Sequence, residues 1–331
     1  MSAREHLVLA FRRAYGVEVK SLVRRRTVVG VVAEDGSHFI WKPLNARDDE
    51  ERLSALAGLR PVFESAGTEA ALPLPTLSGG YVLEVGSGLQ SGYLQKWVTG
   101  RHVDASSLRE RHAVLSSLGR VHRRSQICGF PAWSTLQRGT LLHKLRLKER
   151  AVSRIWAPAE VACPALRGWK ARVEGQMRYV LRRYAAYLAE CRDDVQHAFA
   201  FCHRDLAPHN VMYQGADEVA WIDFDHANYD DMLHDPMQFI SHCTYLAQMS
   251  AEEYYDLHQR YAESANLTAT QASTLWTLTM WPDILVRTLL EWTRAGCREE
   301  GLTRVHYALT CERRKLAYRS ELGLNVERLD A

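Results

Sequence analysis

The sequence lacks several features that would place it in a common protein class. None of its seven cysteines forms a Cys-x-x-Cys pair and their number is odd, which argues against a zinc site or a disulfide framework. No run of about 18 apolar residues occurs, since the best candidate, residues 275–290, contains Pro282, Asp283 and Arg287; no membrane span is therefore expected. The formal net charge of only +3 gives no reason to expect a nucleic-acid partner.

The N-terminal residues also lack the pattern of a secretion signal. Arg12 and Arg13 interrupt the apolar part of residues 1–16, so no apolar segment is long enough for a signal peptide. Scattered thiols of this kind are typical of a reducing compartment. We therefore expect a soluble protein that is made in the cytoplasm and has no membrane partner.

The order of the expected elements indicates two unequal lobes. Residues 1–16 have the apolar spacing of a short helix, and later segments predict strands at 27–33, 38–42, 81–85 and 91–98 and a helix at 48–60. From residue 106 the periodicity is mostly helical. The sequence predicts an α+β fold in which a small β-rich lobe with one helix on its sheet, residues 1–98, faces a large helical lobe, residues 99–331, across a cleft.

The most specific chemical signal is the pattern His203-x-Asp205-x-x-x-x-Asn210, in a short loop that Pro208 stiffens. Phosphoryl transfer needs a carboxylate beside the incoming hydroxyl and oxygen ligands for Mg²⁺. Asp205 would orient the acceptor hydroxyl and take its proton, Asn210 would bind Mg²⁺ through its amide oxygen, and His203 would brace the loop. The alternative is an ordinary surface loop with a hydrogen-bonded histidine.

A second acidic pattern follows thirteen residues after Asn210. The apolar residues 219–222 end in Asp223, which places a carboxylate at the mouth of a strand, where a further Mg²⁺ ligand belongs. Asp225 points the same way if the chain is extended. Both acids are therefore candidate metal ligands.

Lys42 ends the strand predicted at residues 38–42 and could neutralise the α- and β-phosphates of ATP. The alternative is a solvated lysine at a strand end. A glutamate of the next helix usually holds such a lysine, and Glu50 and Glu51 both qualify. Helical spacing puts Glu50 on the side of Leu53 and favours it, although both glutamates could simply cap the helix.

Taken together, these residues resemble the aminoglycoside phosphotransferase and choline kinase superfamily. The resemblance rests on residues 202–210, 222–225, 118–122 and 234–240 and covers nearly the whole chain. It implies a bilobal protein-kinase-like fold, ATP and Mg²⁺ as cofactors, and a structural role for Asp235 in bracing the catalytic loop. The first lobe departs from the kinase pattern because it has no Gly-x-Gly-x-x-Gly turn. Residues 24–27, three arginines and a threonine, occupy that place and either contact phosphate or form a solvated edge.

Softer features resemble the spore-coat CotS-type branch of that superfamily, namely residues 49–53, 96–100, 278–283 and 312–316. This resemblance implies that Lys96, Trp97 and Val98 form the hinge beside the nucleotide. It also implies deposition in the spore coat, with other coat proteins as partners.

The acceptor is suggested only by charge. The helical segment at about 138–192 carries thirteen Lys and Arg against four Asp and Glu, which is either an exposed helix surface or a wall of the acceptor site. A basic wall would repel polycationic aminoglycosides and would suit an anionic acceptor. Two functions remain open at this point. One is an ATP- and Mg²⁺-dependent kinase acting on a hydroxyl group, and the other is a catalytically weak kinase-fold scaffold of the spore coat.

Overall fold

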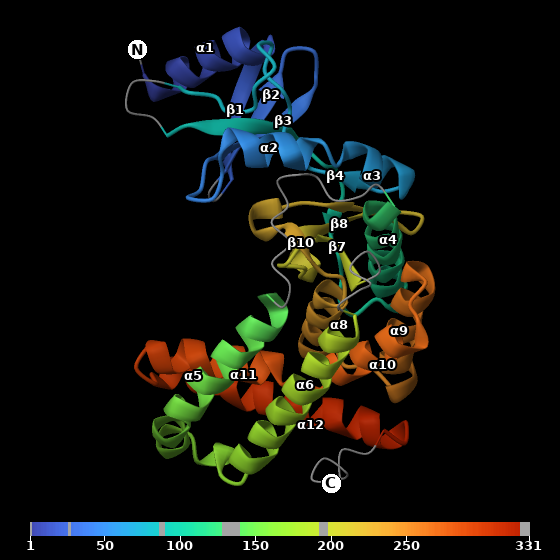
Figure 1. Ribbon diagram of the computed structural model, residues 1–331. Coiled ribbons are helices and arrows are strands. Elements are labelled where there is room, and N and C mark those ends of the chain that lie inside the picture. Colours follow the sequence, from blue (N-terminus) through green and yellow to red (C-terminus); the bar gives the residue numbers. More distant parts are fainter. Residues whose placement is uncertain (1, 26–27, 86–89, 128–139, 192–197, 325–331) are drawn as a thin grey trace.

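The computed structural model describes residues 2–25, 28–85, 90–127, 140–191 and 198–324. Figure 1 shows a small lobe built around a sheet and, beneath it, a larger lobe made mainly of helices. The expected α+β bilobal kinase-like architecture is therefore confirmed. In the described part of the chain, no helix combines the length and apolar character needed to cross a membrane.

The small lobe is built on a four-stranded antiparallel sheet. Its strands, in spatial order, are β1 (Val19–Arg25), β2 (Val28–Ala33), β3 (His38–Pro43) and β5 (Gly92–Lys96). Helix α1 (Ala3–Tyr15) covers one face, where Phe11 meets Trp41 edge-on at 6.4 Å between ring centroids. Since strand side chains alternate between faces, Trp41 points to this core and its neighbour Lys42 points to the opposite face.

The helical region after β3 differs from the prediction. The expected helix at 48–60 is divided into α2 (Glu50–Ala57) and α3 (Arg60–Ser65), because Pro61 lacks the N–H that a continuing helix requires. Phe63 of α3 packs edge-on against Phe201 and Trp221 at 5.9 Å. This segment thus joins the core of the large lobe.

The second predicted hairpin is only half formed. Strand β5 pairs with β3, whereas residues 81–85 contribute a single bridge, between Leu83 and Gly92. Glu50 binds the backbone of residues 81 and 82 instead, and this contact holds the segment away from a regular ladder.

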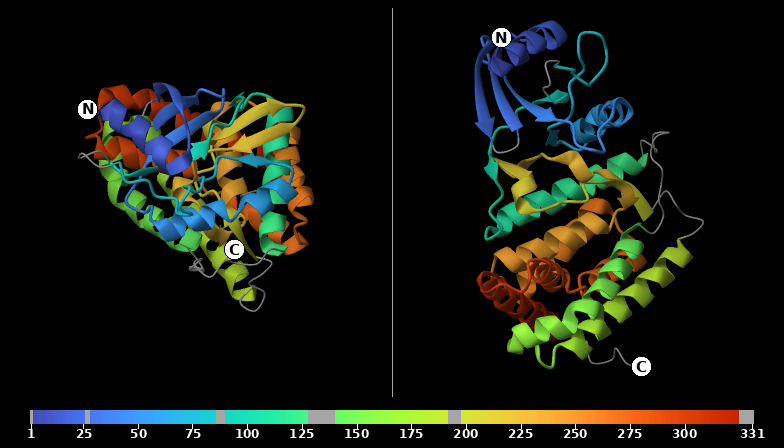
Figure 2. Two further views of the ribbon diagram at one scale, coloured as in Figure 1. Left: turned by 90° about the horizontal axis from the view of Figure 1, so that it is seen from above. Right: turned by 90° about the vertical axis from the view of Figure 1, so that its left-hand side faces the viewer.

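The large lobe contains two small sheets and a helical body. One sheet has the order β4 (Glu69–Ala70), β9 (Glu218–Trp221), β8 (Val211–Gly215) and β6 (Arg101–His102), and the other pairs β10 (Asn228–Asp231) with β7 (Phe199–Cys202). The helices are α4 (Leu108–Ile127), α5 (Thr140–Ala162), α6 (Lys170–Glu190), α8 (His234–Leu246), α9 (Ala251–Ala265), α10 (Ala269–Leu278), α11 (Asp283–Arg294) and α12 (Leu302–Glu321). The basic segment forms α5 and α6, which lie side by side on the outside of this body (Figure 2).

Candidate active site

The loop that follows β7 is held by the buried carboxylate of Asp235. Asp235, in the first turn of α8, accepts the backbone N–H of His203 at 2.6 Å and that of Arg204 at 2.8 Å. Arg204 has a φ of +64°, a left-handed conformation that costs a non-glycine residue roughly 1–3 kcal/mol. The two hydrogen bonds hold the loop in this strained turn. The His203 ring nitrogen Nε2 lies 2.8 Å from the carbonyl oxygen of Ile222 and so ties the loop to the second acidic segment.

Asp235 keeps a low pKa although it is buried, which favours the charged carboxylate. Burial alone would raise its pKa, but the hydrogen bond and charge of His122, whose Nε2 lies 3.5 Å from the carboxylate, lower the pKa to about 2. A charged acceptor forms stronger hydrogen bonds than a neutral one. The geometry therefore fits the expected bracing role of Asp235.

The chain after Arg204 brings Asp205 and Asn210 together. The Asn210 side-chain amide donates to the Asp205 carbonyl oxygen at 2.8 Å, and a short 3-10 helix, Pro208–Asn210, makes the turn. Among the residues that the structure describes, the Asp205 carboxylate has only long contacts, 3.4 Å to Asn210 Nδ2 and 3.5 Å to Gln238 Nε2. Its oxygens therefore keep lone pairs available for a hydroxyl proton.

Lys42 meets the second acidic segment across the two lobes. Its Nζ lies 2.7 Å from Asp223 Oδ1 and 2.6 Å from Asp225 Oδ1. Burial lowers the pKa of Lys42, but the two carboxylates have the larger effect, so the pKa of Lys42 is raised overall. Burial raises the pKa of Asp223, but Lys42 has the larger effect, so the pKa of Asp223 is lowered overall. Asp223 also has a left-handed φ of +67°, which marks it as a position held under backbone strain.

Glu50 does not have the partner that we expected. Its carboxylate accepts the backbone N–H of Tyr81 at 2.6 Å and that of Val82 at 2.9 Å, while Lys42 pairs with the acids of the large lobe. Helical spacing predicts the side of α2 on which Glu50 lies. It does not predict that residues 81 and 82, 31 residues later in the chain, return to contact Glu50. The proposed Glu50–Lys42 pair is therefore wrong for this structure.

Arg52 is the residue of α2 that reaches the acidic segment, and sequence reasoning missed it. Its guanidinium donates to the carbonyl oxygens of Phe224 at 3.0 Å, Ala227 at 3.1 Å and Asp225 at 3.2 Å. Three carbonyl oxygens suit the donor fork of an arginine. An arginine in the acidic first turns of a helix carries no local signal of such a role, because its partners lie more than 170 residues later in the chain.

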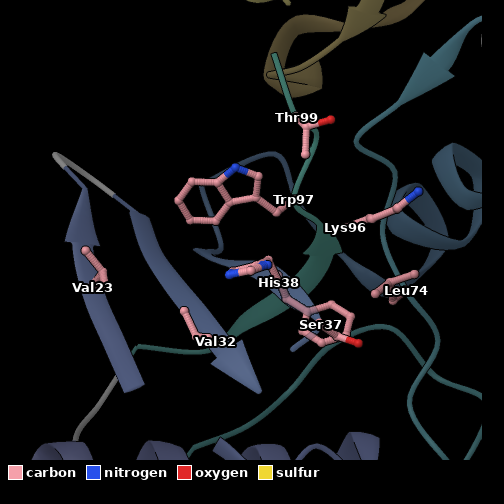
Figure 3. A pocket seen from close by; sticks show the side chains of 9 residues that line it. Val23, Val32, Ser37, His38, Leu74, Lys96, Trp97 and Thr99 are labelled. Atoms are coloured by element: carbon pink, nitrogen blue, oxygen red, sulfur yellow. The ribbon is translucent and has the colours of Figure 1, made fainter. Parts of the chain in front are cut away.

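The hinge between the lobes borders a cavity of about 660 Å³ (Figure 3). Figure 3 shows the Trp97 indole beside the His38 ring, and the two meet edge-on at 6.2 Å between centroids. Trp97 also covers β2 so closely that a Cβ on Gly30 would come within 2.5 Å of the indole. Lys96 lines the cavity and pairs with Glu69 at 2.7 Å. Val98 is buried against Ala71 and Ala220 and is absent from the cavity wall.

The arginine-rich turn of residues 24–27 falls largely outside the described residues. Arg24 ends in an exposed side chain. Its expected contact with phosphate stays a prediction.

The comparison with known families identifies the chain. The model of the phosphotransferase enzyme family (APH) matches residues 24–271, which include Lys42, Asp205 and Asp223. The chain belongs to this family. No curated protein matches the sequence.

Solved structures that resemble this phosphotransferase-family chain share its whole fold at low identity. An aminoglycoside phosphotransferase from Alicyclobacillus acidocaldarius has a TM-score of 0.70 at 14% identity, with 95% of this chain and 94% of that chain covered. A microcompartment-associated aminopropanol kinase has 0.63 at 16%, with 97% and 98% covered. An amicoumacin kinase in complex with AMP-PNP, Ca²⁺ and amicoumacin has 0.61 at 13%, with 94% of both chains covered. At these identities the likeness establishes the fold.

The donor atoms at the acidic segment suit a hard divalent cation. Asp223 and Asp225 direct one oxygen each at the same ammonium group, and their side chains are 47% and 32% exposed, so an ion from solvent could reach both. Carboxylate and amide oxygens are the ligands that Mg²⁺ and Ca²⁺ prefer. The buried group of His122, Cys202 and Asp235 also gathers metal-ligand types, but the loop, Tyr261 and backbone carbonyls already engage these three side chains.

Proposed function

We propose that this protein is an ATP- and Mg²⁺-dependent phosphotransferase that transfers the γ-phosphoryl group to a hydroxyl of a small molecule or protein. The observation that carries the proposal is the meeting of Lys42 with Asp223 and Asp225 from opposite lobes, with distances of 2.7 and 2.6 Å. A lysine on the third strand and an acid after a short strand are the parts that such enzymes place around the phosphates.

Each residue has a definite role in this proposal. With ATP bound, Lys42 exchanges its carboxylate partners for the α- and β-phosphates, and Asn210, Asp223 and Asp225 offer oxygen ligands to Mg²⁺, which neutralises phosphate charge. Asp205 orients the acceptor hydroxyl and accepts its proton. Lys96 and Trp97 contact the nucleotide base at the hinge cavity, whereas the burial of Val98 restricts it to supporting the hinge.

The test is the rate of ADP formation from ATP with Mg²⁺, measured for the wild type and Asp205→Asn. Loss of a positioned base costs on the order of 10²–10⁴-fold in rate, so we expect a fall of at least about 100-fold. Asp217→Asn is the matched control, because this exposed acid in the turn between β8 and β9 has Arg109 as its ion-pair partner in the described part of the chain. An unchanged rate in Asp205→Asn would sink the proposed mechanism.

We further propose an acceptor that is anionic rather than polycationic. The positive charge of α5 and α6 supports this choice, since a basic wall opposes a cationic ligand. Although several proteins with this fold are aminoglycoside kinases, we expect no transfer to kanamycin. Efficient transfer in a purified assay would contradict the proposal.

A spore-coat location is proposed only from the resemblance of residues 49–53, 96–100, 278–283 and 312–316 to the CotS-type branch. If the protein served there as an inactive scaffold, ATP would not bind in a Mg²⁺-dependent way, and Asp205→Ala and Asp223→Ala would leave coat assembly normal. The convergence of the charged groups at the cleft favours catalysis over this scaffold function.

A further inference from the structure

Lys144 is a half-buried cation that has no partner among the described residues. It lies in the first turns of α5, which contacts β10 (Figure 1). One turn later, Lys148 pairs with Asp283 at 2.7 Å. No hydrogen bond or ion pair joins Lys144 to any residue that the structure describes. Partial burial of an ammonium group without a counter-ion is unfavourable unless a ligand supplies the negative charge.

The surroundings of Lys144 do not compensate its charge. The acid that most favours the charged form of Lys144 is Asp230, and Arg204 already pairs with it, with Nε 3.1 Å from Oδ2. Burial first, then the positive charges of Arg204 and Lys148, lower the pKa of Lys144, and Asp230 only partly opposes them. The carboxylate that would favour the charge of Lys144 is therefore already paired with Arg204, the residue before Asp205 in the loop.

A second cation faces the same loop from another helix. Arg287 of α11 lies 3.5 Å from the ring of His242, and among the described residues it has no carboxylate within ion-pair distance. Burial, followed by Arg287, lowers the pKa of His242 to about 4, while Asp283 and then Asp205 act in the opposite direction. His242 is therefore neutral at physiological pH, so Arg287, which also interacts electrostatically with Asp283 one turn earlier on α11, is the cation of this pair.

We propose that Lys144 binds a phosphate or carboxylate group of the acceptor, the molecule whose hydroxyl group Asp205 orients. Arg287 of α11 adds electrostatic attraction for the same group. This inference rests on the proposed phosphotransferase function, because it assigns the acceptor side of the same cleft. Among the described cations of α5, Lys144 interacts electrostatically with Arg204 and Asp230 beside the catalytic loop, and Lys148 pairs with Asp283 of α11. Lys148 is neutralised by Asp283, which leaves Lys144 to recognise the anion.

The first experiment measures anion binding without requiring turnover. Inorganic phosphate, then acetate, is titrated by calorimetry into the protein saturated with ADP and Mg²⁺. We expect binding of one or both anions, at least fivefold weaker in Lys144→Gln and retained in Lys144→Arg. The matched control is Arg146→Gln, an exposed position two residues along the same helix. Binding that is absent, or equal in Lys144→Gln and wild type, overturns the inference.

The two anions separate the two kinds of acceptor. Tighter binding of phosphate indicates a phosphorylated alcohol, and tighter binding of acetate indicates a hydroxy acid. Failure of ADP and Mg²⁺ to bind would count against the proposed function, not against the anion site. In that case the titrations are made on the free protein and are judged by the same dependence on Lys144.

The second experiment compares acceptors that share one carbon skeleton. Glucose, glucosamine, gluconate and glucose 6-phosphate differ mainly in charge and are offered with ATP and Mg²⁺. We expect an anionic member to have the highest kcat/KM, and Lys144→Gln to raise its KM at least tenfold while kcat changes less. A preference for glucose or glucosamine, or an anionic preference that survives in Lys144→Gln, contradicts the inference. If no member is phosphorylated, the calorimetric result decides.

Discussion

Replacing Asp235 with asparagine should damage both the stability of the fold and the catalytic loop. The carboxylate accepts two backbone N–H groups, those of His203 and Arg204. An asparagine offers one acceptor oxygen and one NH₂ group, so one of these buried N–H groups would lose its partner. The strained turn at Arg204 would then lose half of what holds it.

Two estimates of the cost agree. A hydrogen bond to a charged group contributes about 1.5–3 kcal/mol, and an unsatisfied buried donor costs about 1–3 kcal/mol. The lowered pKa, about 2 against an ordinary 3.8, corresponds to roughly 2–3 kcal/mol of preference for the charged form. We therefore expect Asp235→Asn to lose about 3 kcal/mol of unfolding free energy and roughly 4 °C in melting midpoint.

The measurement is urea unfolding at several pH values, with the exposed Asp256→Asn on α9 as control. Since the pKa of Asp235 is lower in the folded state, its contribution is complete above about pH 4 and disappears as the pH falls towards 2. The wild type should lose stability over this range more steeply than the variant. A loss below about 1 kcal/mol at pH 7, which is under the range for one charged hydrogen bond, or equal acid sensitivity in both proteins, would refute the reasoning.

Substitutions at Arg52, Gly30 and Asp231 test other contacts. Arg52→Ala removes three hydrogen bonds to carbonyl oxygens and should weaken Mg²⁺-dependent ATP binding at least tenfold by calorimetry, while Arg52→Lys should restore only part of it. Gly30→Ala forces the Trp97 indole to move, so it should lower the unfolding free energy by about 1–3 kcal/mol and change the tryptophan fluorescence. Gly175→Ala, in open space on α6, should raise the unfolding free energy by about 0.5–1 kcal/mol. Equal effects of the two substitutions would contradict the packing of Trp97 on Gly30. Burial raises the pKa of Asp231 to about 7, so the folded state retains a proton that the unfolded state releases, and stability should fall as the pH rises from about 4 to 7. Asp231→Asn should flatten this decline in urea titrations, and an unchanged slope would count against it.

The local part of the site could be predicted from sequence because its signals are short-range. Asp205 and Asn210 are five residues apart in one loop, and Asp223 follows a short apolar strand, so periodicity and turn chemistry were enough to place them. The strand that carries Lys42 was also recognisable from its own residues. The overall order of strands and helices followed from the same patterns.

The predictions that were wrong or missing concern contacts between segments that are distant in the sequence. Glu50 turned to residues 81 and 82 because the chain returns there, and Arg52 found carbonyl oxygens more than 170 residues away. Which side chain of α2 meets which loop is decided by how the lobes pack, and no spacing within the helix encodes that. The division of α2 and α3 was, by contrast, visible at Pro61.

The most direct test of the central claim is calorimetric titration of ATP into the wild type and Asp223→Asn, with and without Mg²⁺. We expect the wild type to bind ATP at least tenfold more tightly when Mg²⁺ is present, and we expect Asp223→Asn to lose this gain. Asp217→Asn should behave as the wild type. ATP affinity that is equal with and without Mg²⁺, or a Mg²⁺ effect that is unchanged in Asp223→Asn, would contradict the account.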